Sequence, residues 1–296
     1  MTADERNFRS TYYEKVGFRN VEEKKSLEIL LKDKHVDILK LKQFCLRFSV
    51  PAIYRNTVWK LLLNVIPKYE NCRQFVMEQR NQEFKDLLHV VQVMRLVDGN
   101  TSKPQVFLIM WLLQSGNLGY DFNTQYHRDY GFINIVQSLM EYFHFTDDID
   151  IYWIAKSLYG NIIKIETDFP KLLECTCTIL EREDNALYKY LQGEGILNNL
   201  PLEKWYKSCL AGVLNDSALA KIWDKLCGGS NKILVFAVIS LLINQKYRLL
   251  TCTTLNQALD YLKNISDDAA DVIANQSIEM WQQNGSPLTV HDKPKP

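Results

Sequence analysis

The sequence has no excess of either charge, because 35 lysines and arginines balance 35 aspartates and glutamates among its 296 residues. Proteins that bind nucleic acid or an anionic membrane through overall charge carry a basic surplus. The composition therefore favours neither nucleic-acid binding nor direct membrane insertion. The longest apolar run, Ile233–Ile243, is also short. It cannot span a bilayer and suits a buried helix.

The cysteines form no clear metal-binding pattern. Seven are spread along the chain, and only Cys175-Thr-Cys177 brings two close together. One such pair is a weak indication of zinc, and free thiols in a reducing compartment are the better interpretation. The first residues, MTADERNFRS, lack the apolar run of a signal peptide. We therefore expect a globular cytoplasmic or nuclear protein without a metal or other cofactor.

Period-two alternation, which is typical of a half-buried strand, does not persist anywhere in the sequence. Apolar stripes of helical period follow one another instead, separated by short breaks and without a repeat of constant length. The missing repeat argues against a solenoid. The sequence predicts a single irregular all-α domain over residues 20–285, preceded by an arm at 1–19 and followed by a disordered tail at 286–296.

The stretch Pro51–Leu63, PAIYRNTVWKLLL, carries the first informative pattern. Proline suits the start of a helix, where its missing N–H is not needed. Arg55 precedes Trp59 by four residues, so the guanidinium can stack on the indole along one helix face. On periodicity alone, this is an ordinary amphipathic helix with a surface arginine over a tryptophan.

A second pattern lies at residues 219–226, where helical spacing places Trp223 on an apolar face. Asp224 follows directly, so its carboxylate is expected to point toward the domain edge and to accept a hydrogen bond from a nearby arginine. Lys225 is expected on the polar side of the same helix. Taken alone, this pattern is also structural.

In this order, the two patterns resemble the TBC domain, the fold of Rab GTPase-activating proteins. That family opens with Arg-x-x-x-Trp and a leucine run, matched here from Arg55 to Leu63, and carries Ile-Trp-Asp near its end, matched at 222–224. The resemblance covers residues 50–245. It implies an all-helical fold in which four residues are structural: Arg55, Trp59, Trp223 and Asp224.

The resemblance also implies how an active member works. An arginine neutralises charge on the transferring phosphoryl group, and a glutamine positions the attacking water. The arginine belongs to an Ile-x-x-Asp-x-x-Arg pattern; Arg95 aligns with it, but Gln92 replaces the aspartate. Phe132 occupies the glutamine position of Tyr-x-Gln-Gly, and a phenyl ring cannot orient water. Gln125 and Gln137 flank this position in the wrong register.

Helical spacing from Asn71 to Val97 predicts a long helix with two adjacent apolar stripes. They span roughly 220°, whereas a helix buried on one side needs only about 100° or slightly more. Either neighbouring helices sandwich this helix, or part of the arc accepts an amphipathic partner helix. Arg95 is then either a degenerate arginine finger or the solvated end of the helix. The candidate partner-binding residues are Phe84, Leu87, Val90, Val91, Val93, Met94 and Val97.

A closer resemblance links Arg6–Asp33 and Lys232–Phe236 to the small TBC proteins that assemble with hamartin and tuberin. It implies binding to the coiled coil of hamartin, and through it to tuberin, in a complex that restrains Rheb upstream of mTOR. Any endolysosomal or vesicle location would then come from these partners. Two functions stay open: a non-catalytic adaptor, or an active GTPase-activating protein for a Rab-family GTPase that uses Arg95. A small GTPase, Rab or Rheb, is a further candidate partner.

Overall fold

The computed structural model describes residues 21–119, 128–141, 143 and 145–292. Among these residues there is no strand, and the only β-type pairings are two isolated bridges. The predicted all-α fold is thus confirmed. The elements in chain order are α2 (Val21–Lys32), α3 (Ile38–Arg47), α4 (Ala52–Leu62), α5 (Glu70–Val93), α6 (Lys103–Gln114), α8 (Tyr130–Glu141), α9 (Asp148–Ile163), η1 (Glu166–Asp168), α10 (Phe169–Glu183), α11 (Asn185–Gly193), α12 (Ile196–Asn199), α13 (Leu202–Lys207), α14 (Asp216–Cys227), α15 (Ile233–Asn244), α16 (Lys246–Leu249), α17 (Leu255–Lys263) and α18 (Asp267–Gln283).

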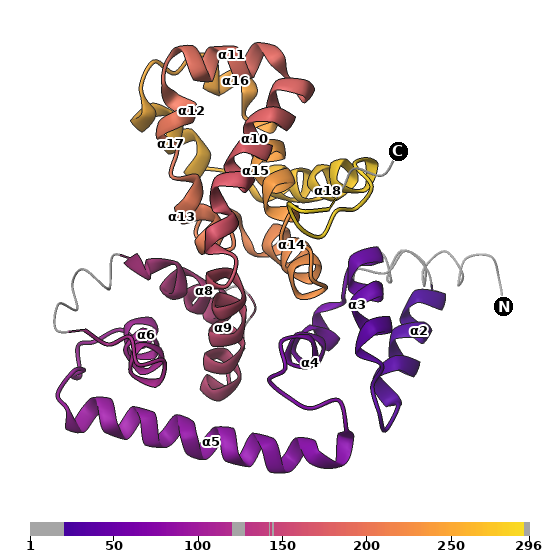
Figure 1. Cartoon of the computed structure of the whole chain (residues 1–296), viewed down its shortest axis with the longest axis vertical. Coiled ribbons are helices and arrows are strands. Elements are labelled where there is room, and N and C mark those ends of the chain that lie inside the picture. Colours follow the sequence, from indigo (N-terminus) through magenta and orange to yellow (C-terminus); the bar gives the residue numbers. More distant parts are fainter. Residues whose placement is uncertain (1–20, 120–127, 142, 144, 293–296) are drawn as a thin grey trace.

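The helices fall into three groups that surround a shared centre (Figure 1). The long helix α5 runs along the bottom of the view, beneath α6, α8 and α9 at one end and beneath α2–α4 at the other. The helices α14, α15 and α18 pack together in the middle. The helices α11, α12, α16 and α17 lie at the far end from α5, and α10 and α13 connect them to the middle.

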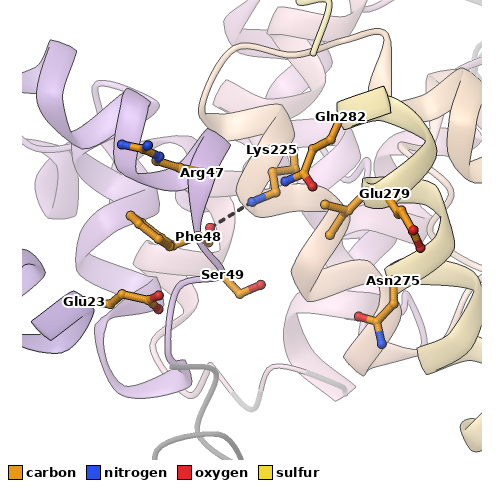
Figure 2. A pocket seen from close by; sticks show the side chains of 9 residues that line it. Glu23, Arg47, Phe48, Ser49, Lys225, Asn275, Glu279 and Gln282 are labelled. Atoms are coloured by element: carbon orange, nitrogen blue, oxygen red, sulfur yellow. Dashed lines mark hydrogen bonds between the residues drawn. The ribbon is translucent and has the colours of Figure 1, made fainter. Parts of the chain in front are cut away.

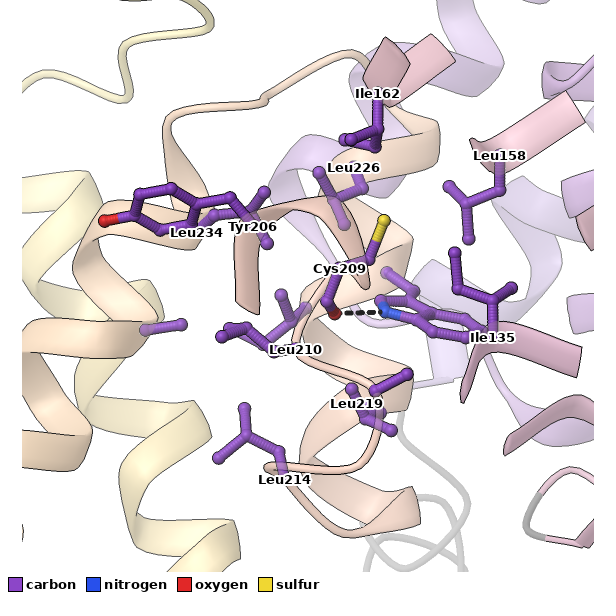
Figure 3. Close-up of a cluster of buried hydrophobic side chains, with 14 of the residues drawn as sticks. Ile135, Leu158, Ile162, Tyr206, Cys209, Leu210, Leu214, Leu219, Leu226 and Leu234 are labelled. Carbon is purple, nitrogen blue, oxygen red and sulfur yellow. Dashed lines mark hydrogen bonds between the residues drawn. The ribbon is translucent and has the colours of Figure 1, made fainter. Parts of the chain in front are cut away.

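The central helix α15 is buried on every face, from Ile233 to Leu242. This explains the uninterrupted apolar run in its sequence, since each side of the helix meets a neighbour. Side chains of α8, α9, α14 and the turn after α13 meet next to it in one continuous core (Figure 3). In that core the Trp223 indole donates to the Cys209 carbonyl oxygen at 2.9 Å.

The helix predicted over 71–97 ends earlier, at Val93. The Leu96 N–H donates to the Val91 carbonyl and the Arg95 N–H to the Gln92 carbonyl, both at 3.0 Å. These two bonds form a Schellman motif, which stops a helix by turning the residue after its C-cap into the left-handed region. Arg95 takes that conformation, with φ of 55°.

Residues 286–292, which were expected in a disordered tail, lie against the domain instead. The Trp281 indole N–H and the Ser230 hydroxyl both donate to the Pro287 carbonyl, at 2.8 and 2.9 Å. These bonds hold the segment because they satisfy polar groups next to the core. The arm predicted at 1–19 lies outside the described residues.

The close approach of α8 to the end of α13 generates a prediction about Gly131. A Cβ at this position would meet the Lys207 carbonyl group at 3.0 Å and the Ser208 nitrogen at 3.1 Å, and backbone atoms cannot move aside easily. We expect Gly131→Ala to lower the free energy of unfolding by about 1–3 kcal/mol. Denaturant titration followed by circular dichroism measures this change.

Gly160 provides the matched control, because it also lies in a helix and a Cβ there would meet nothing within 4 Å. Gly160→Ala should stabilise the protein by about 0.5–1 kcal/mol, since alanine loses less backbone entropy on folding. If Gly131→Ala stabilised the protein as Gly160→Ala is expected to do, the tight contact between α8 and α13 would be disproved.

Candidate functional site

The two family motifs meet at the carboxylate of Asp224, which is completely buried. Its Oδ1 accepts from the Trp59 indole N–H at 3.0 Å and from Arg55 Nε at 3.3 Å. Its Oδ2 accepts from the Val50 backbone N–H at 2.9 Å. The arginine that Asp224 accepts from is therefore Arg55, but the carboxylate points into the protein and not toward the domain edge. It joins α14 to the start of α4.

Aromatic contacts surround this carboxylate. The Arg55 guanidinium lies 5.7 Å from the Trp59 ring, and the Trp59 and Trp223 rings are 5.7 Å apart. Arg55 Nη2 also donates to the Val50 carbonyl at 2.5 Å. The four residues of the family pattern thus form one hydrogen-bonded and stacked unit, which offers no free polar group for chemistry. Its role is structural.

Lys225 is buried as well, with 1% of its surface exposed, although the sequence suggested the polar side of the helix. Its Nζ donates to the Cys45 carbonyl at 2.7 Å and to the Phe48 carbonyl at 2.9 Å, so it caps the end of α3 (Figure 2). The sequence contained one indication that Lys225 is buried: the apolar residues Ala220 and Cys227 lie near it on the same helix. They indicate that α14 is buried over most of its surface, and Ser217 and Lys221 are its partly exposed residues.

Burial affects the ionisation of this pair of neighbouring residues. It raises the pKa of the Asp224 carboxyl, an effect that the Arg55 guanidinium opposes. It lowers the pKa of Lys225 to about 8, because the ammonium group is removed from water. Burial likewise raises the pKa of the thiols of Cys45, Cys209 and Cys227. These thiols are protonated at neutral pH and are poor nucleophiles.

Phe132, at the position of the family glutamine, is fully buried in an aromatic cluster. Its ring stacks on Trp111 with centroids 5.6 Å apart and meets the edge of Tyr159 at the same distance. The Tyr159 hydroxyl donates to Asp129 at 2.9 Å. Gln137 is exposed elsewhere on α8. Phe132 therefore presents no polar group to a bound GTPase.

Arg95, the candidate arginine finger, lies in the turn after α5 with its side chain exposed. Gln92, at the aspartate position of the pattern, is exposed too, and its side chain makes no hydrogen bond to Arg95 among the described residues. Phe132 makes its ring contacts with Trp111 and Tyr159, in α6 and α9. The two positions that act together in an active member are thus a free arginine and a buried phenyl ring.

The candidate partner-binding residues on α5 divide into two sets. Phe84 and Val91 are buried, because α5 packs on α6 and α9, where Phe84 touches the rings of Phe107 and Tyr152 at 5.6 Å. They are part of the core and cannot contact a partner in this structure. Partly buried residues of the set pack against the same core; these are Leu87 and Val97.

The remaining candidates are exposed. Val93 has 66% of its surface exposed, Met94 51% and Val90 39%, and Leu96 next to them has 37%. We call these four residues the α5-end patch. Among the described residues, no helices sandwich this end of α5, so the first interpretation of the wide apolar arc does not hold here. Exposed apolar side chains that gather in this way mark contact surfaces more often than isolated ones do.

A cavity of 520 Å³ lies between α2, α3 and α18 (Figure 2). Its walls carry both charges, with Glu23 and Glu279 against Arg47 and Lys225. Arg95 does not line it, so it is separate from the positions discussed above. Within the described ranges, no cluster of three His, Cys, Asp or Glu side chains could hold a metal ion, and no helix is long and apolar enough to cross a membrane.

Comparisons with known proteins agree with this geometry. The family profile of the Rab-GTPase-TBC domain matches residues 119–250. The chain is 39% identical to "TBC1 domain family member 7" of Bos taurus over 292 residues, which is 97% of this chain and 99% of the relative. The Homo sapiens protein of the same name is 38% identical, with the same coverage.

Solved structures are similar in fold alone. The Ypt/Rab-GAP domain of Gyp1p superposes with a TM-score of 0.64 at 16% identity, covering 89% of this chain and 98% of that one. A Chlamydomonas flagellar RabGAP TBC domain superposes with a TM-score of 0.53 at 15% identity, covering 86% and 84%. The predicted TBC fold is thus confirmed.

The buried Asp224 generates a stability prediction. Asp224→Ala should lower the free energy of unfolding by about 3–5 kcal/mol, because the Arg55 charge and the two N–H donors lose their buried acceptor. Asp148→Ala is the control, since its ion pair with Lys103 is largely exposed, and it should cost at most about 1 kcal/mol. Equal losses in urea titrations would show that the Asp224 contacts do not stabilise the fold.

The lowered pKa of Lys225 generates a prediction about pH. Between about 8 and the ordinary value of 10.5, the unfolded chain binds the lysine proton more tightly than the folded one. The wild type should therefore gain stability relative to Lys225→Met as pH rises through this window, by up to about 1.4 kcal/mol per pH unit. Below pH 8 the difference should stay constant. Urea titrations of both proteins from pH 7 to 10 test this, and a falling difference would refute it.

Proposed function

The chain belongs to the TBC-domain family, alongside the relatives named TBC1 domain family member 7, and from this premise we propose that it is a non-catalytic adaptor. Its proposed partner is the coiled coil of hamartin, with tuberin reached through it. The adaptor would stabilise this GTPase-activating complex and so contribute to the restraint of Rheb and mTOR signalling. Recruitment to endolysosomal or vesicle membranes would come from the partners.

The observation that carries the proposal is the environment of Phe132. In an active member, a glutamine at this position orients the attacking water, which needs a donor and an acceptor on an accessible side chain. Here a phenyl ring with no exposed surface lies between Trp111 and Tyr159. The neighbouring Tyr159 hydroxyl is itself engaged, because it donates to Asp129 at 2.9 Å.

The scaffold around the lost position is intact. Asp224 joins both motifs of the family, and the Trp59 and Trp223 rings pack against each other at an interplanar angle of 52°. Buried hydrogen-bonded networks of this kind fix a unique arrangement of helices. A fold kept in full while its water-orienting side chain is absent is what an adaptor requires, since an adaptor needs only shape and surface.

The α5-end patch supplies a surface for a partner. Val90, Val93 and Met94 are spaced as i, i+3 and i+4, so their side chains form a ridge on one helix face. Such a ridge fits against the apolar stripe of a second helix. A coiled coil that exposes part of its apolar seam is a partner of matching chemistry.

The second candidate function is GTPase activation through Arg95 alone. It is favoured by one observation, the exposed position of this side chain at the end of α5. An arginine supplied in trans can be worth roughly three to five orders of magnitude in hydrolysis rate, provided that the GTPase supplies its own glutamine. Rab-family proteins and Rheb are the candidate substrates of this function.

Binding and hydrolysis assays together test the adaptor proposal. We expect the wild type to bind a hamartin coiled-coil fragment in titration calorimetry, and Val93→Asp to bind it at least 10-fold more weakly, because a charge is placed on the apolar ridge. Val272→Asp is the control, since Val272 is exposed on α18, away from the patch. Its affinity should equal that of the wild type. No binding by the wild type would refute the proposal.

The hydrolysis assay separates the two functions. The adaptor should leave the rate of GTP hydrolysis by Rab-family proteins and Rheb unchanged. Stimulation by several orders of magnitude that disappears in Arg95→Ala would establish the second function instead.

A further inference from the structure

Arg95 holds a backbone conformation that arginine rarely adopts. Its φ of 55° lies in the left-handed region, at the position of a Schellman motif that glycine usually occupies because it has no Cβ. Side chains at such positions strain the backbone, and strain of this kind concentrates at functional sites. A glycine here would end α5 equally well, so the motif itself does not require an arginine.

The Arg95 guanidinium also differs from those of the other arginines. Within the part of the chain that the structure describes, it makes no hydrogen bond, ion pair or stacking contact. Each of the others makes at least one such side-chain contact: Arg47, Arg55, Arg73, Arg80, Arg128, Arg182 and Arg248. The acid nearest in sequence is already engaged, since Asp98 Oδ1 accepts from the Asn100 N–H and the Thr101 hydroxyl at 2.9 Å. An unpaired cation therefore projects from a strained turn.

The residues next to Arg95 in the sequence are apolar. Val93 and Met94 precede it and Leu96 follows it, all three in the exposed α5-end patch. A partner that covers this patch removes water from the guanidinium, which is costly unless an acceptor replaces the water. A carboxylate is the best acceptor, because it can take two parallel N–H bonds from an arginine. The occupant must therefore combine an apolar stripe with an acidic residue.

We infer that Arg95 is the anchor of the partner contact, where it pairs with an aspartate or glutamate that flanks the apolar stripe of the partner helix. Coiled coils carry glutamate at the positions beside their apolar seam, so a coiled-coil partner meets this requirement. The inference rests on the proposed adaptor function and adds the chemistry of recognition to it. It also explains why an arginine occupies a position that usually holds glycine, since the favourable energy of the partner contact offsets the unfavourable backbone conformation.

The experiment measures stability and affinity on the same set of full-length variants. Arg95→Gly relieves the strained backbone and removes the guanidinium. It should raise Tm by about 2 °C and weaken binding of the hamartin coiled-coil fragment at least 10-fold. Arg95→Glu should bind more weakly than Arg95→Gly, because it places a like charge against the partner's carboxylate. The affinity of the wild type should fall with added salt more steeply than that of Arg95→Gly.

Asn64→Gly is the matched control. Asn64 occupies the same position after α4 as Arg95 does after α5, with φ of 57°, and the N–H groups of Asn64 and Val65 donate to the Leu61 and Lys60 carbonyls in the same Schellman pattern. Its replacement should raise Tm in the same way and leave the affinity unchanged. A purely structural role of Arg95 would give the same result for both glycine variants.

Three outcomes would overturn the inference. If Arg95→Gly binds the fragment as tightly as the wild type, Arg95 is no anchor, while the adaptor function stands. If Arg95→Gly instead abolishes stimulation of GTP hydrolysis by a Rab-family protein, the arginine serves catalysis. If the wild type does not bind the fragment, the adaptor function fails, and the inference fails with it.

Discussion

The arrangement of the domain depends on one buried carboxylate. Asp224 accepts hydrogen bonds from a backbone N–H, an indole and a guanidinium, all from a segment 165–174 residues earlier in the chain. Since a buried carboxylate is costly without such donors, each partner makes the others necessary. Lys225 adds a second connection to the end of α3. The two motifs that mark the family in sequence are thus one structural unit that joins the N-terminal helices to the centre of the fold.

The two positions that the family pattern assigns to catalysis lie apart from this unit. At position 132 an aromatic side chain completes a cluster with Trp111 and Tyr159. At position 95 the arginine is present but lies in a strained turn without a partner among the described residues. Loss of one position and retention of the other are consistent with a change of role, from acting on a nucleotide to contacting a protein.

Much of the fold could be predicted from the sequence, because apolar residues in long amphipathic helices recur with a period of about 3.6 residues. The fold class, the buried α15 and the pairing of Asp224 with an arginine all followed from spacing. What spacing cannot give is how many neighbours surround a helix. Lys225 was therefore expected in solvent, and Phe84 and Val91 were expected on a partner surface although they face the core. The short helices α12 and α16 leave no periodic signal, and the early end of α5 depends on a backbone turn that carries no glycine.

The long sequence separation at Asp224 also has a consequence for synthesis in the cell. Arg55 leaves the ribosome 169 residues before its acceptor. At about 5–20 residues per second, this delay amounts to roughly 8–34 s. During that time Trp59 can reach Phe143 and Phe145 but has no aspartate to bind, so part of its apolar surface is open to chaperones. The final docking of the N-terminal helices is therefore a late event on the ribosome, which makes the nascent chain dependent on protection before any partner protein can bind it.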